Sequence, residues 1–373
     1  MTAHILSIGT ALPQTTIEQD DMRDFFARQP GYDRLASRLV HAAFDAAAIE
    51  RRHTVVTELA DGGTHGRDVF VSADGVLQAP STGVRNAVYA AEAPALFAEA
   101  ARAALTGAGI TADAVTHVVT ASCTGFFAPG PDYRLIRDLG LPATVERYHL
   151  GFLGCAAAFP ALRTASHICA SRPDAVVLVV CAELCSLHIR SSTEPDQIVA
   201  SSVFADGAAA AVVSGRSGSG PSLELERFGT SVTSEGETDM VWLIGDEGFE
   251  MTLTAEVPRI IGREILDVVT GFLDAAPGDE RPWGVDAWAV HPGGRSILDR
   301  VESSLSLDPA ALAASRAVLQ QAGNMSSATI LFILRDLLAD AALGDDARIA
   351  GLAFGPGLTV ESLLAVKHMP PAA

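Results

Sequence analysis

Apolar runs of two kinds alternate along the chain. Short runs bounded by Gly, Pro or polar residues predict β-strands, and longer Ala-rich stretches with apolar residues at helical spacing predict α-helices. The predicted strands are 5–9, 117–122, 175–181, 208–213, 287–290, 349–354 and 362–366. The predicted helices are 90–105, 154–170, 257–273 and 328–338. This alternation indicates a mixed α/β protein.

The clearest predicted loop lies in the middle of the chain. Residues 215–221 are rich in Gly and Ser, a composition typical of a connection between structured segments. We therefore expect an N-terminal half, residues 1–219, and a C-terminal half, residues 220–373. No internal repeat is visible in the sequence itself.

Composition narrows the class of protein. The chain has 373 residues, of which 49% are hydrophobic, so it can bury a large core as one or two closely joined domains. With 26 Lys and Arg against 45 Asp and Glu, the net charge is -19, which argues against nucleic acid as a partner. We expect no membrane span and no signal peptide, because no uninterrupted apolar segment is long enough and no basic N-terminal region precedes one.

Cysteine usage predicts a reduced protein. The five cysteines form no disulfide-scaffold pattern, which indicates a cytoplasmic location. No paired cysteines occur with His at metal-ligand spacing, and no phosphate-loop or dinucleotide fingerprint is present, so we expect no metal and no cofactor.

Cys155 is the first candidate for chemistry. It lies in the stretch GFLGCAAA, where Gly151 and Gly154 predict a tight turn immediately before a buried helix. A cysteine in the first turn of a helix faces free backbone N–H groups and the positive end of the dipole, which favour thiolate over thiol. The alternative is a small cysteine that only fills a close-packed core.

Two later segments supply possible partners for a nucleophile. His291 follows the predicted strand 287–290 and precedes a Pro-Gly-Gly break, a placement common for active-site residues on loops. Asn324 lies in GNMSSAT before a predicted helix, where it is either a helix N-cap or a polar donor. A Cys, a His and an Asn together form a nucleophile, a base and an orienting or oxyanion-binding group.

The chain resembles a type III polyketide synthase, of the chalcone synthase-like group in the thiolase superfamily. The resemblance rests on SCTGFFAPGPDYRL, the Cys155 turn, VFADGAAAA, HPGGRSILDRVE, GNMSSATILFIL and FGPGLTVE, in the order and spacing of that family. Ketoacyl synthases that initiate fatty-acid synthesis also use Cys, His and Asn. Their asparagine motif typically reads GNTSAA, and they lack the Gly-Pro-Gly loop in this form.

This resemblance implies a five-layered αβαβα thiolase fold built from two similar halves. Cys155 would lie in the first half and His291 and Asn324 in the second, with the active site between them. Cys155 would carry an acyl group from acyl-CoA, with its thiolate stabilised by a His291 imidazolium. His291 and Asn324 would stabilise the enolate formed when malonyl-CoA loses carbon dioxide. No metal or redox cofactor is implied, and the working unit would be a homodimer.

The resemblance also implies a set of residues around the substrate. Phe204 would be the gatekeeper between tunnel and cavity, although an ordinary core aromatic is the alternative. The other substrate-binding candidates are Cys123, Thr124, Cys185, His188, Trp242, Met251, Ser326, Gly293, Gly294, Arg295, Gly355, Pro356 and Gly357.

The sequence departs from this family in two places. Trp242 stands where plant enzymes tend to have a small residue, so its indole would narrow the route for bulky aromatic starters. The stretch 39–49 is largely apolar where plant relatives carry a basic helix for coenzyme A phosphates, and Arg295 replaces a common proline. Only four basic residues lie near that stretch: Arg38, His41, Arg51 and Arg52. Delivery of the starter by coenzyme A or by an acyl carrier protein therefore stays open.

Three segments indicate a subgroup within this family: TGFFAPG, GFLGCAAAF and AELCSLH. These segments look more like bacterial alkylresorcinol and alkylpyrone synthases than like plant chalcone synthases. Such relatives extend aliphatic acyl starters with malonyl units. The alternatives are an initiating 3-ketoacyl synthase that performs one condensation, and a non-catalytic subunit of the thiolase fold that binds acyl chains. The sequence leaves starter length, number of extensions and mode of cyclisation open.

Overall fold

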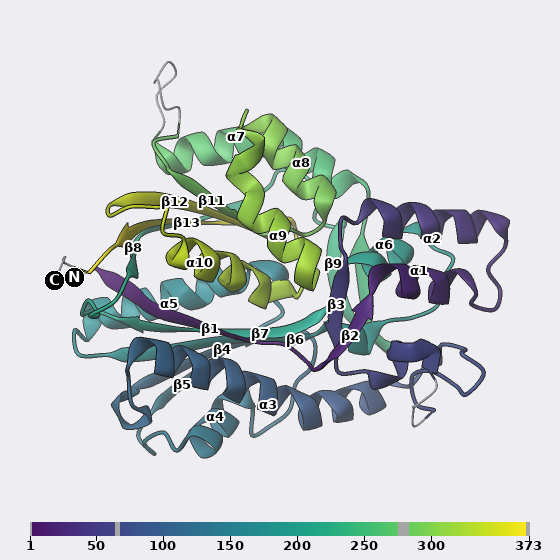
Figure 1. Cartoon of the computed structure of the whole chain (residues 1–373), viewed down its shortest axis with the longest axis horizontal. Helices are drawn as coiled ribbons and strands as arrows, with labels where there is room; N and C mark the ends of the chain where they lie inside the picture. The colour runs from purple at the N-terminus through teal and green to yellow at the C-terminus, as the bar shows by residue number, and fades with distance from the viewer. Residues whose placement is uncertain (1, 64–67, 275–282, 371–373) are drawn as a thin grey trace.

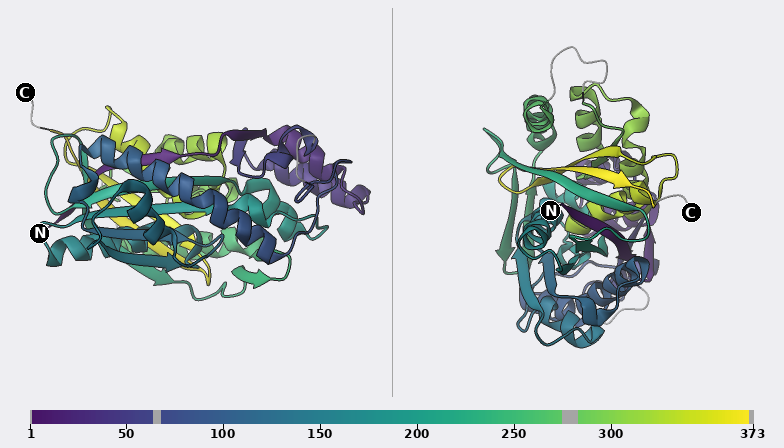
Figure 2. Two further views of the ribbon diagram at one scale, coloured as in Figure 1. Left: turned by 90° about the horizontal axis from the view of Figure 1, so that it is seen from below. Right: turned by 90° about the vertical axis from the view of Figure 1, so that its left-hand side faces the viewer.

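Two stacked groups of strands enclose a layer of buried helices in the computed structural model, which describes residues 2–63, 68–274 and 283–370 (Figure 1). The end-on view in Figure 2 shows the yellow strands of the second half above the purple and teal strands of the first. With helices on both outer faces, the architecture is the predicted αβαβα arrangement, a mixed α/β protein with a large central sheet.

The strands of the first half run in the spatial order β5-β4-β6-β7-β1. Their bounds are β5 (Glu146–Gly151), β4 (His117–Ser122), β6 (Val176–Leu184), β7 (Asp206–Ser214) and β1 (Ala3–Ala11). β4 pairs in parallel with β5 and β6, whereas β7 is antiparallel to both of its neighbours. β5 therefore ends the sheet as an edge strand, with mostly exposed residues.

The strands of the second half continue from β1 in the order β8-β13-β12-β11. Their bounds are β8 (Ser222–Val232), β13 (Thr359–His368), β12 (Ala347–Gly355) and β11 (Ala287–Val290). Only three residue pairs, from Ala3↔Leu225 to Ile5↔Leu223, link β1 to β8. The short link lets the second group of strands turn away and lie over the first.

Helices α5 (Ala158–Ser171) and α10 (Thr329–Ala339) form the middle layer, and α5 contacts strands of both halves. Ala161 and Ala165 of α5 share one fully buried cluster with Ile330 and Ile333 of α10. Small residues on α5 permit this close helix–sheet packing. The outer layers are α3 (Thr82–Ala108) and α4 (Pro131–Leu139) on the first half, and α7 (Glu256–Leu273) and α8 (Arg295–Ser304) on the second (Figure 1).

A further group of short elements covers the end of the sheets opposite to the start of β1 (Figure 1). It comprises β2 (Thr15–Glu18), α1 (Gln19–Ala27), α2 (Arg34–Ala46), β3 (Arg51–Thr54), α6 (Pro195–Val203), β9 (Met240–Gly245) and β10 (Gly248–Leu253). These elements were not predicted from the sequence, nor were α4, α8, α9 (Ala313–Ala322), β5 and β8.

Every strand and helix that was predicted is present; the strands 117–122 and 287–290 have the predicted bounds, and the other elements have shifted ends. The predicted helix 90–105 extends over the whole of α3, and the predicted helix 154–170 begins as a 3-10 turn, Gly154–Ala156, before α5. Residues 215–221 form the expected exposed connection between β7 and β8. Among the described residues, no helix is both long and apolar enough to cross a membrane.

Candidate active site

Two short 3-10 turns meet at the inner ends of the middle helices. Cys155 lies in the turn Gly154–Ala156 that leads into α5, and Asn324 lies just before the turn Ser326–Ala328 that leads into α10. The Sγ of Cys155 is 3.9 Å from Oδ1 and 4.0 Å from Nδ2 of Asn324. The two halves of the fold thus each contribute one polar side chain to the same point.

The glycine-rich loop 355–357 shapes the cysteine turn. Gly154 has a φ of +59°, and a Cβ on it would lie 2.7 Å from Cδ of Pro356. A Cβ on Gly355 would lie 2.9 Å from the carbonyl oxygen of Leu153. Glycine is therefore required on both sides of this contact, because any side chain would push the loop and the turn apart.

Asn324 is held by its backbone and by its side chain. Its N–H donates to the Val203 carbonyl at 2.9 Å, and its carbonyl accepts from the Ala205 N–H at 2.8 Å. Its Oδ1 accepts the Ser326 N–H at 2.8 Å, a local bond of the kind that favours Asn at helix starts. Nδ2 is left facing Cys155 and the Gly293 carbonyl, 3.4 Å away, so the local bond of Oδ1 leaves this donor group directed at the cysteine. Asn324 is not the N-cap itself, since Met325 holds that position before the turn Ser326–Ala328.

His291 follows directly after β11, as predicted, and is fully buried. Neither ring nitrogen has a hydrogen-bond partner among the described residues. Burial lowers the pKa of His291 to about 3, so the imidazole is neutral at physiological pH. A buried histidine with two unpartnered nitrogens is available to a bound substrate.

The cysteine thiol is neutral as well. Burial raises the pKa of Cys155 to about 11, against the opposing effect of hydrogen bonds from Ser326 and Asn324. Burial of both side chains therefore opposes the expected thiolate–imidazolium pair in the resting site. The helix N-terminus does favour the charged form, but loss of water around the sulfur outweighs it.

Two cavities meet at Cys155. The outer cavity has a volume of about 580 Å³ and is bordered by His291, Asn324, Gly293, Gly294 and Arg295 among others. The inner cavity has a volume of about 70 Å³ and is bordered by Cys123, Thr124, Cys185, His188, Trp242, Ser326 and Pro356 among others. Phe204 and Met251 border both cavities, as Cys155 does. Of the predicted substrate-binding residues, only Gly355 and Gly357 border neither.

Phe204 stands between the cavities at the end of α6. The guanidinium of Arg52 donates to the Phe204 carbonyl at 2.9 Å and to the Ser201 carbonyl at 2.7 Å. Arg52 is buried, and that burial lowers its pKa to about 10. It was grouped with the basic residues near the carrier, but it points inward and fixes the backbone that carries Phe204.

Aromatic rings fill much of the space beside the inner cavity. His188 donates from Nε2 to the Thr124 carbonyl at 2.7 Å and accepts the Phe249 N–H on Nδ1 at 2.9 Å. Its ring stacks on Phe249 at 4.3 Å and meets Trp242 edge-on at 5.4 Å. Both nitrogens of His188 are thus occupied, so this residue shapes the cavity without offering a free base.

Trp242 is fixed at the same wall. Its Nε1–H donates to the Cys123 carbonyl at 2.6 Å, which directs the indole across the inner cavity. The expected narrowing by Trp242 is consistent with the small volume there. Phe249 also borders the inner cavity and was not among the predicted residues, although its strand, GFEMTL, is largely apolar.

A buried carboxylate is hydrogen-bonded to two residues that border the inner cavity, Cys123 and Thr124. Glu183 accepts hydrogen bonds from the Cys123 N–H, from the Thr124 hydroxyl at 2.8 Å and from the Ser327 hydroxyl at 2.5 Å. Burial raises the pKa of Glu183. Sequence reasoning missed this residue, although a lone acid inside the apolar run of β6 is the signal that points to it.

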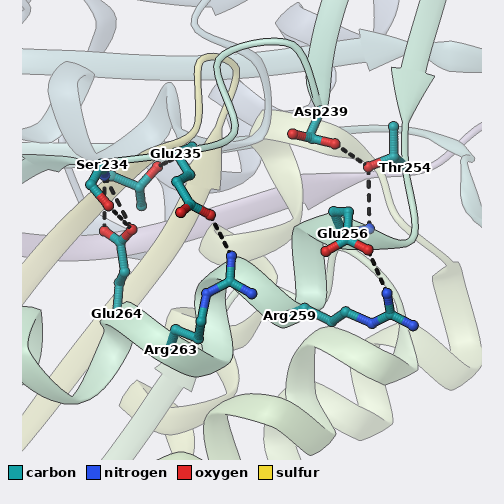
Figure 3. A network of polar contacts seen from close by, with 9 residues as sticks. Ser234, Glu235, Asp239, Thr254, Glu256, Arg259, Arg263 and Glu264 are labelled. Carbon is teal, nitrogen blue, oxygen red and sulfur yellow. Dashed lines mark hydrogen bonds and ion pairs between the residues drawn. The ribbon is translucent and has the colours of Figure 1, made fainter.

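Arginines gather at the rim of the outer cavity, where Arg259, Arg295 and Arg300 are exposed. Figure 3 shows Arg259 paired with Glu256 on α7, and Arg263 one turn further along paired with Glu235. Arg295 lies 3.4 Å from a carboxylate oxygen of Asp299. Arg300 has no ion-pair partner within the described part of the chain.

The sequence and the fold both match known proteins. The N-terminal domain of chalcone and stilbene synthases matches residues 1–220, and their C-terminal domain matches residues 230–369. A similar solved structure is the C-terminal type III polyketide synthase domain of Steely1, a type I/III hybrid from Dictyostelium. It is 29% identical, with a TM-score of 0.87, over 98% of this chain and 99% of that chain.

A second similar structure is PKS-I from the brown alga Ectocarpus siliculosus, 28% identical with a TM-score of 0.88 over 98% of each chain. The chain therefore belongs to the chalcone and stilbene synthase family, whose members are type III polyketide synthases of the thiolase-like fold. Members of this family are acyltransferases that use coenzyme A thioesters.

Proposed function

We propose that the protein condenses an aliphatic acyl-CoA starter with malonyl-CoA and cyclises the product to an alkylpyrone or alkylresorcinol. The observation that supports this most strongly is the convergence of Cys155, His291 and Asn324 on the outer cavity. A thiol, a neutral imidazole with free nitrogens and an amide N–H group are the parts that acyl transfer and enolate formation need.

In the loading step, the Cys155 thiol gives its proton to His291 as sulfur attacks the thioester carbonyl of the starter. The carbon–sulfur bond to coenzyme A then breaks, and His291 returns the proton to the departing coenzyme A thiolate. Since both groups start neutral, the ion pair exists only during this transfer. The acyl group is left as a thioester on Cys155.

In the extension step, the malonyl thioester oxygen accepts hydrogen bonds from His291 and from Nδ2 of Asn324. Loss of carbon dioxide leaves an enolate, whose negative oxygen these two donors stabilise in a buried site. The enolate carbon attacks the acyl group on Cys155, and the cysteine sulfur leaves and is free for the next transfer. We expect no metal or redox cofactor in these steps, because the side chains supply the nucleophile and the donors.

The preference for an aliphatic starter is supported by the shape of the inner cavity. Its volume of about 70 Å³ and the bulk of Trp242 and Phe249 leave little room for a planar aromatic starter. The outer cavity has apolar walls from Ala43, Val199, Val203, Leu253 and Ile297, which suit an alkyl chain.

Coenzyme A would approach through the outer cavity. Its phosphates need a cationic site that the net charge of -19 does not suggest. Arg295 and Arg300 at the rim are suited to that role, whereas Arg52 is buried at Phe204. An acyl carrier protein would present the same phosphopantetheine arm at this rim, and it is the alternative carrier.

The small inner cavity also favours a second candidate, an initiating 3-ketoacyl synthase that stops after one condensation. A third, non-catalytic binding of acyl chains, requires that Cys155 take up no acyl group. Mass spectrometry after incubation with a ladder of acyl-CoA starters and malonyl-CoA separates the three. Cyclised products with several extension units support the proposal, a single β-ketoacyl product supports the second candidate, and an unmodified Cys155 supports the third.

We propose further that the protein acts as a homodimer in the cytoplasm. All five cysteines are free and buried, which agrees with a reducing compartment. The edge strand β5 and the neighbouring Phe126, Phe152 and Leu153 expose apolar surface that a second copy would cover.

A further inference from the structure

A second cluster of chemically active side chains lies far along the sheets from α1 and α2, where β1 begins and β13 ends (Figure 1). His4 of β1, Glu224 of β8 and His368 of β13 stand on three adjacent strands. His4 pairs directly with Glu224, and His368 pairs with Ser222, two residues before Glu224. Because side chains alternate along a strand, all three project from one face.

The three side chains are close enough to share one ion. One possible ligand atom from each lies within 4.8 Å of the other two. Nε2 of His368 is 2.7 Å from a carboxylate oxygen of Glu224, and the two imidazole centroids are 5.9 Å apart. A tetrahedral zinc ion with bonds of about 2.0–2.2 Å sets its ligand atoms roughly 3.4 Å apart. Small side-chain rotations are enough to reach that spacing.

The environment of His4 favours a metal site over a simple ion pair between His368 and Glu224. Its Nδ1 is buried and has no hydrogen-bond partner among the described residues. An ion pair between a protonated His368 and Glu224 would explain their contact, but it would leave this nitrogen of His4 unused. A buried nitrogen without a partner is costly, and a metal ion removes that cost.

The residues around His368 also fit a metal site. Its Nδ1 lies 3.5 Å from a carboxylate oxygen of Asp346 and 3.8 Å from one of Asp345. Asp345 is itself held by the N–H of Met369 at 2.8 Å. Metal-bound histidines commonly donate their other ring N–H to a carboxylate, which fixes the tautomer and the ring orientation. Nε2 is then free to face Glu224 and His4.

We propose that His4, Glu224 and His368 bind one divalent first-row metal ion, with zinc as the best match to two imidazoles and a carboxylate. Water from solvent completes the coordination, since all three side chains are partly exposed. The ion joins β1 of the first half to β8 and β13 of the second. Its role is structural, and no step of the condensation passes through it.

The test is a zinc titration of protein without an affinity tag, after removal of metals by a chelator, with a competing chromogenic zinc indicator. We expect one zinc ion per chain, and a higher unfolding temperature with zinc than with chelator. His4→Ala and His368→Ala should lose both effects, and Asp346→Asn should weaken zinc binding about 10- to 100-fold. His167→Ala, an exposed histidine on α5, is the matched control and should bind zinc as the unaltered protein does.

Folding damage and metal loss are distinguishable. Nδ1 of His4 has no hydrogen-bond partner in the described part of the chain, so in chelator His4→Ala should unfold at nearly the same temperature as the unaltered protein. Glu224→Gln, which keeps the side-chain shape, provides a second variant that should also lose zinc. Equal zinc binding by His4→Ala and the unaltered protein, or no zinc bound by either, would overturn the proposal.

Discussion

The Sγ of Cys155 and the side-chain amide of Asn324 lie 3.9–4.0 Å apart, although 169 positions separate them in the chain. Each residue stands just before one of the two middle helices, α5 and α10. The site is therefore a junction of two equivalent helix starts, one from each half of the fold. His291 adds an imidazole from the end of β11, so the proposed nucleophile and its partners come from three rigid elements.

Alkylation of Cys155 tests the neutral resting state. Iodoacetamide should modify Cys155 before the other four cysteines, because it borders both cavities and the thiols of Cys123 and Cys185 have pKa values well above the usual range. With a pKa of about 11, the rate should rise about tenfold per pH unit between neutral and mildly alkaline pH. Peptide mapping by mass spectrometry measures both. A rate that is already constant at neutral pH would mean a thiolate paired with His291.

Asn324→Ala tests the enolate-binding role. The variant loses one donor to the enolate oxygen, so malonyl-CoA decarboxylation should fall about 100- to 1,000-fold. Loading of the starter on Cys155, followed by intact-mass spectrometry, should change much less and is the internal control. An unfolding temperature near that of the unaltered protein excludes general damage. Decarboxylation at a near-normal rate would mean that Asn324 does not stabilise the enolate and that its side chain only accepts the hydrogen bond from the Ser326 N–H.

Trp242→Ala tests the narrowing of the inner cavity. Removing the indole should enlarge that cavity and shift the accepted starters towards bulkier acyl groups. Competition among a ladder of acyl-CoA starters, with products separated by chromatography, measures the shift. Leu243→Ala is the matched control, since Leu243 is exposed and borders neither cavity. An unchanged starter preference in Trp242→Ala would place the selectivity elsewhere.

The rim arginines are tested by a double variant, Arg295→Ala with Arg300→Ala. Loss of two phosphate-binding cations should raise KM for acyl-CoA roughly 10- to 30-fold at low salt, with little effect on kcat. The difference from the unaltered enzyme should shrink as ionic strength rises, because salt screens exposed charges. Arg263→Ala, whose partner is Glu235, is the control. Equal KM values for the unaltered enzyme, the double variant and Arg263→Ala would mean that the phosphates of coenzyme A do not bind at this rim.

Phe126→Asp tests the homodimer. Phe126 is 49% exposed although it is a large aromatic residue, and its loop is held outward by two hydrogen bonds with Asn86. The unaltered protein should scatter light as twice the 38.8 kDa chain, and Phe126→Asp should shift it towards one chain. Leu35→Asp, at an exposed apolar position on α2, should leave the dimer intact. A stable single chain in the unaltered protein would refute the pairing.

The strands that could be predicted from the sequence are those whose burial produces a run of apolar residues. β4 and β7 are buried along their whole length, so their runs of apolar residues mark them clearly. β5 has almost no buried residue, and its polar sequence ERYHLG carries no alternation from which a strand could be inferred. The edge of the first-half sheet therefore became visible only with the structure.

The meeting of the candidate residues at one cavity was predictable from the sequence, but their charge state was not. Cys155, His291 and Asn324 follow from motif and order, since each lies at a glycine-marked break in the chain. Their pKa values depend on how much water the fold removes, which no local pattern reports. The inward position of Arg52 could not be predicted for a related reason. An arginine is expected at the surface, and its burial is explained only by its hydrogen bonds to the carbonyls of Ser201 and Phe204.

The contact between Gly154 and Pro356 limits how this enzyme can be recombined with its relatives. The turn that presents the sulfur comes from one half, and the proline loop that sets its position comes from the other. In a chimera that joins halves from two parents, the Cys155 sulfur keeps its position only if both parents share this glycine–proline contact.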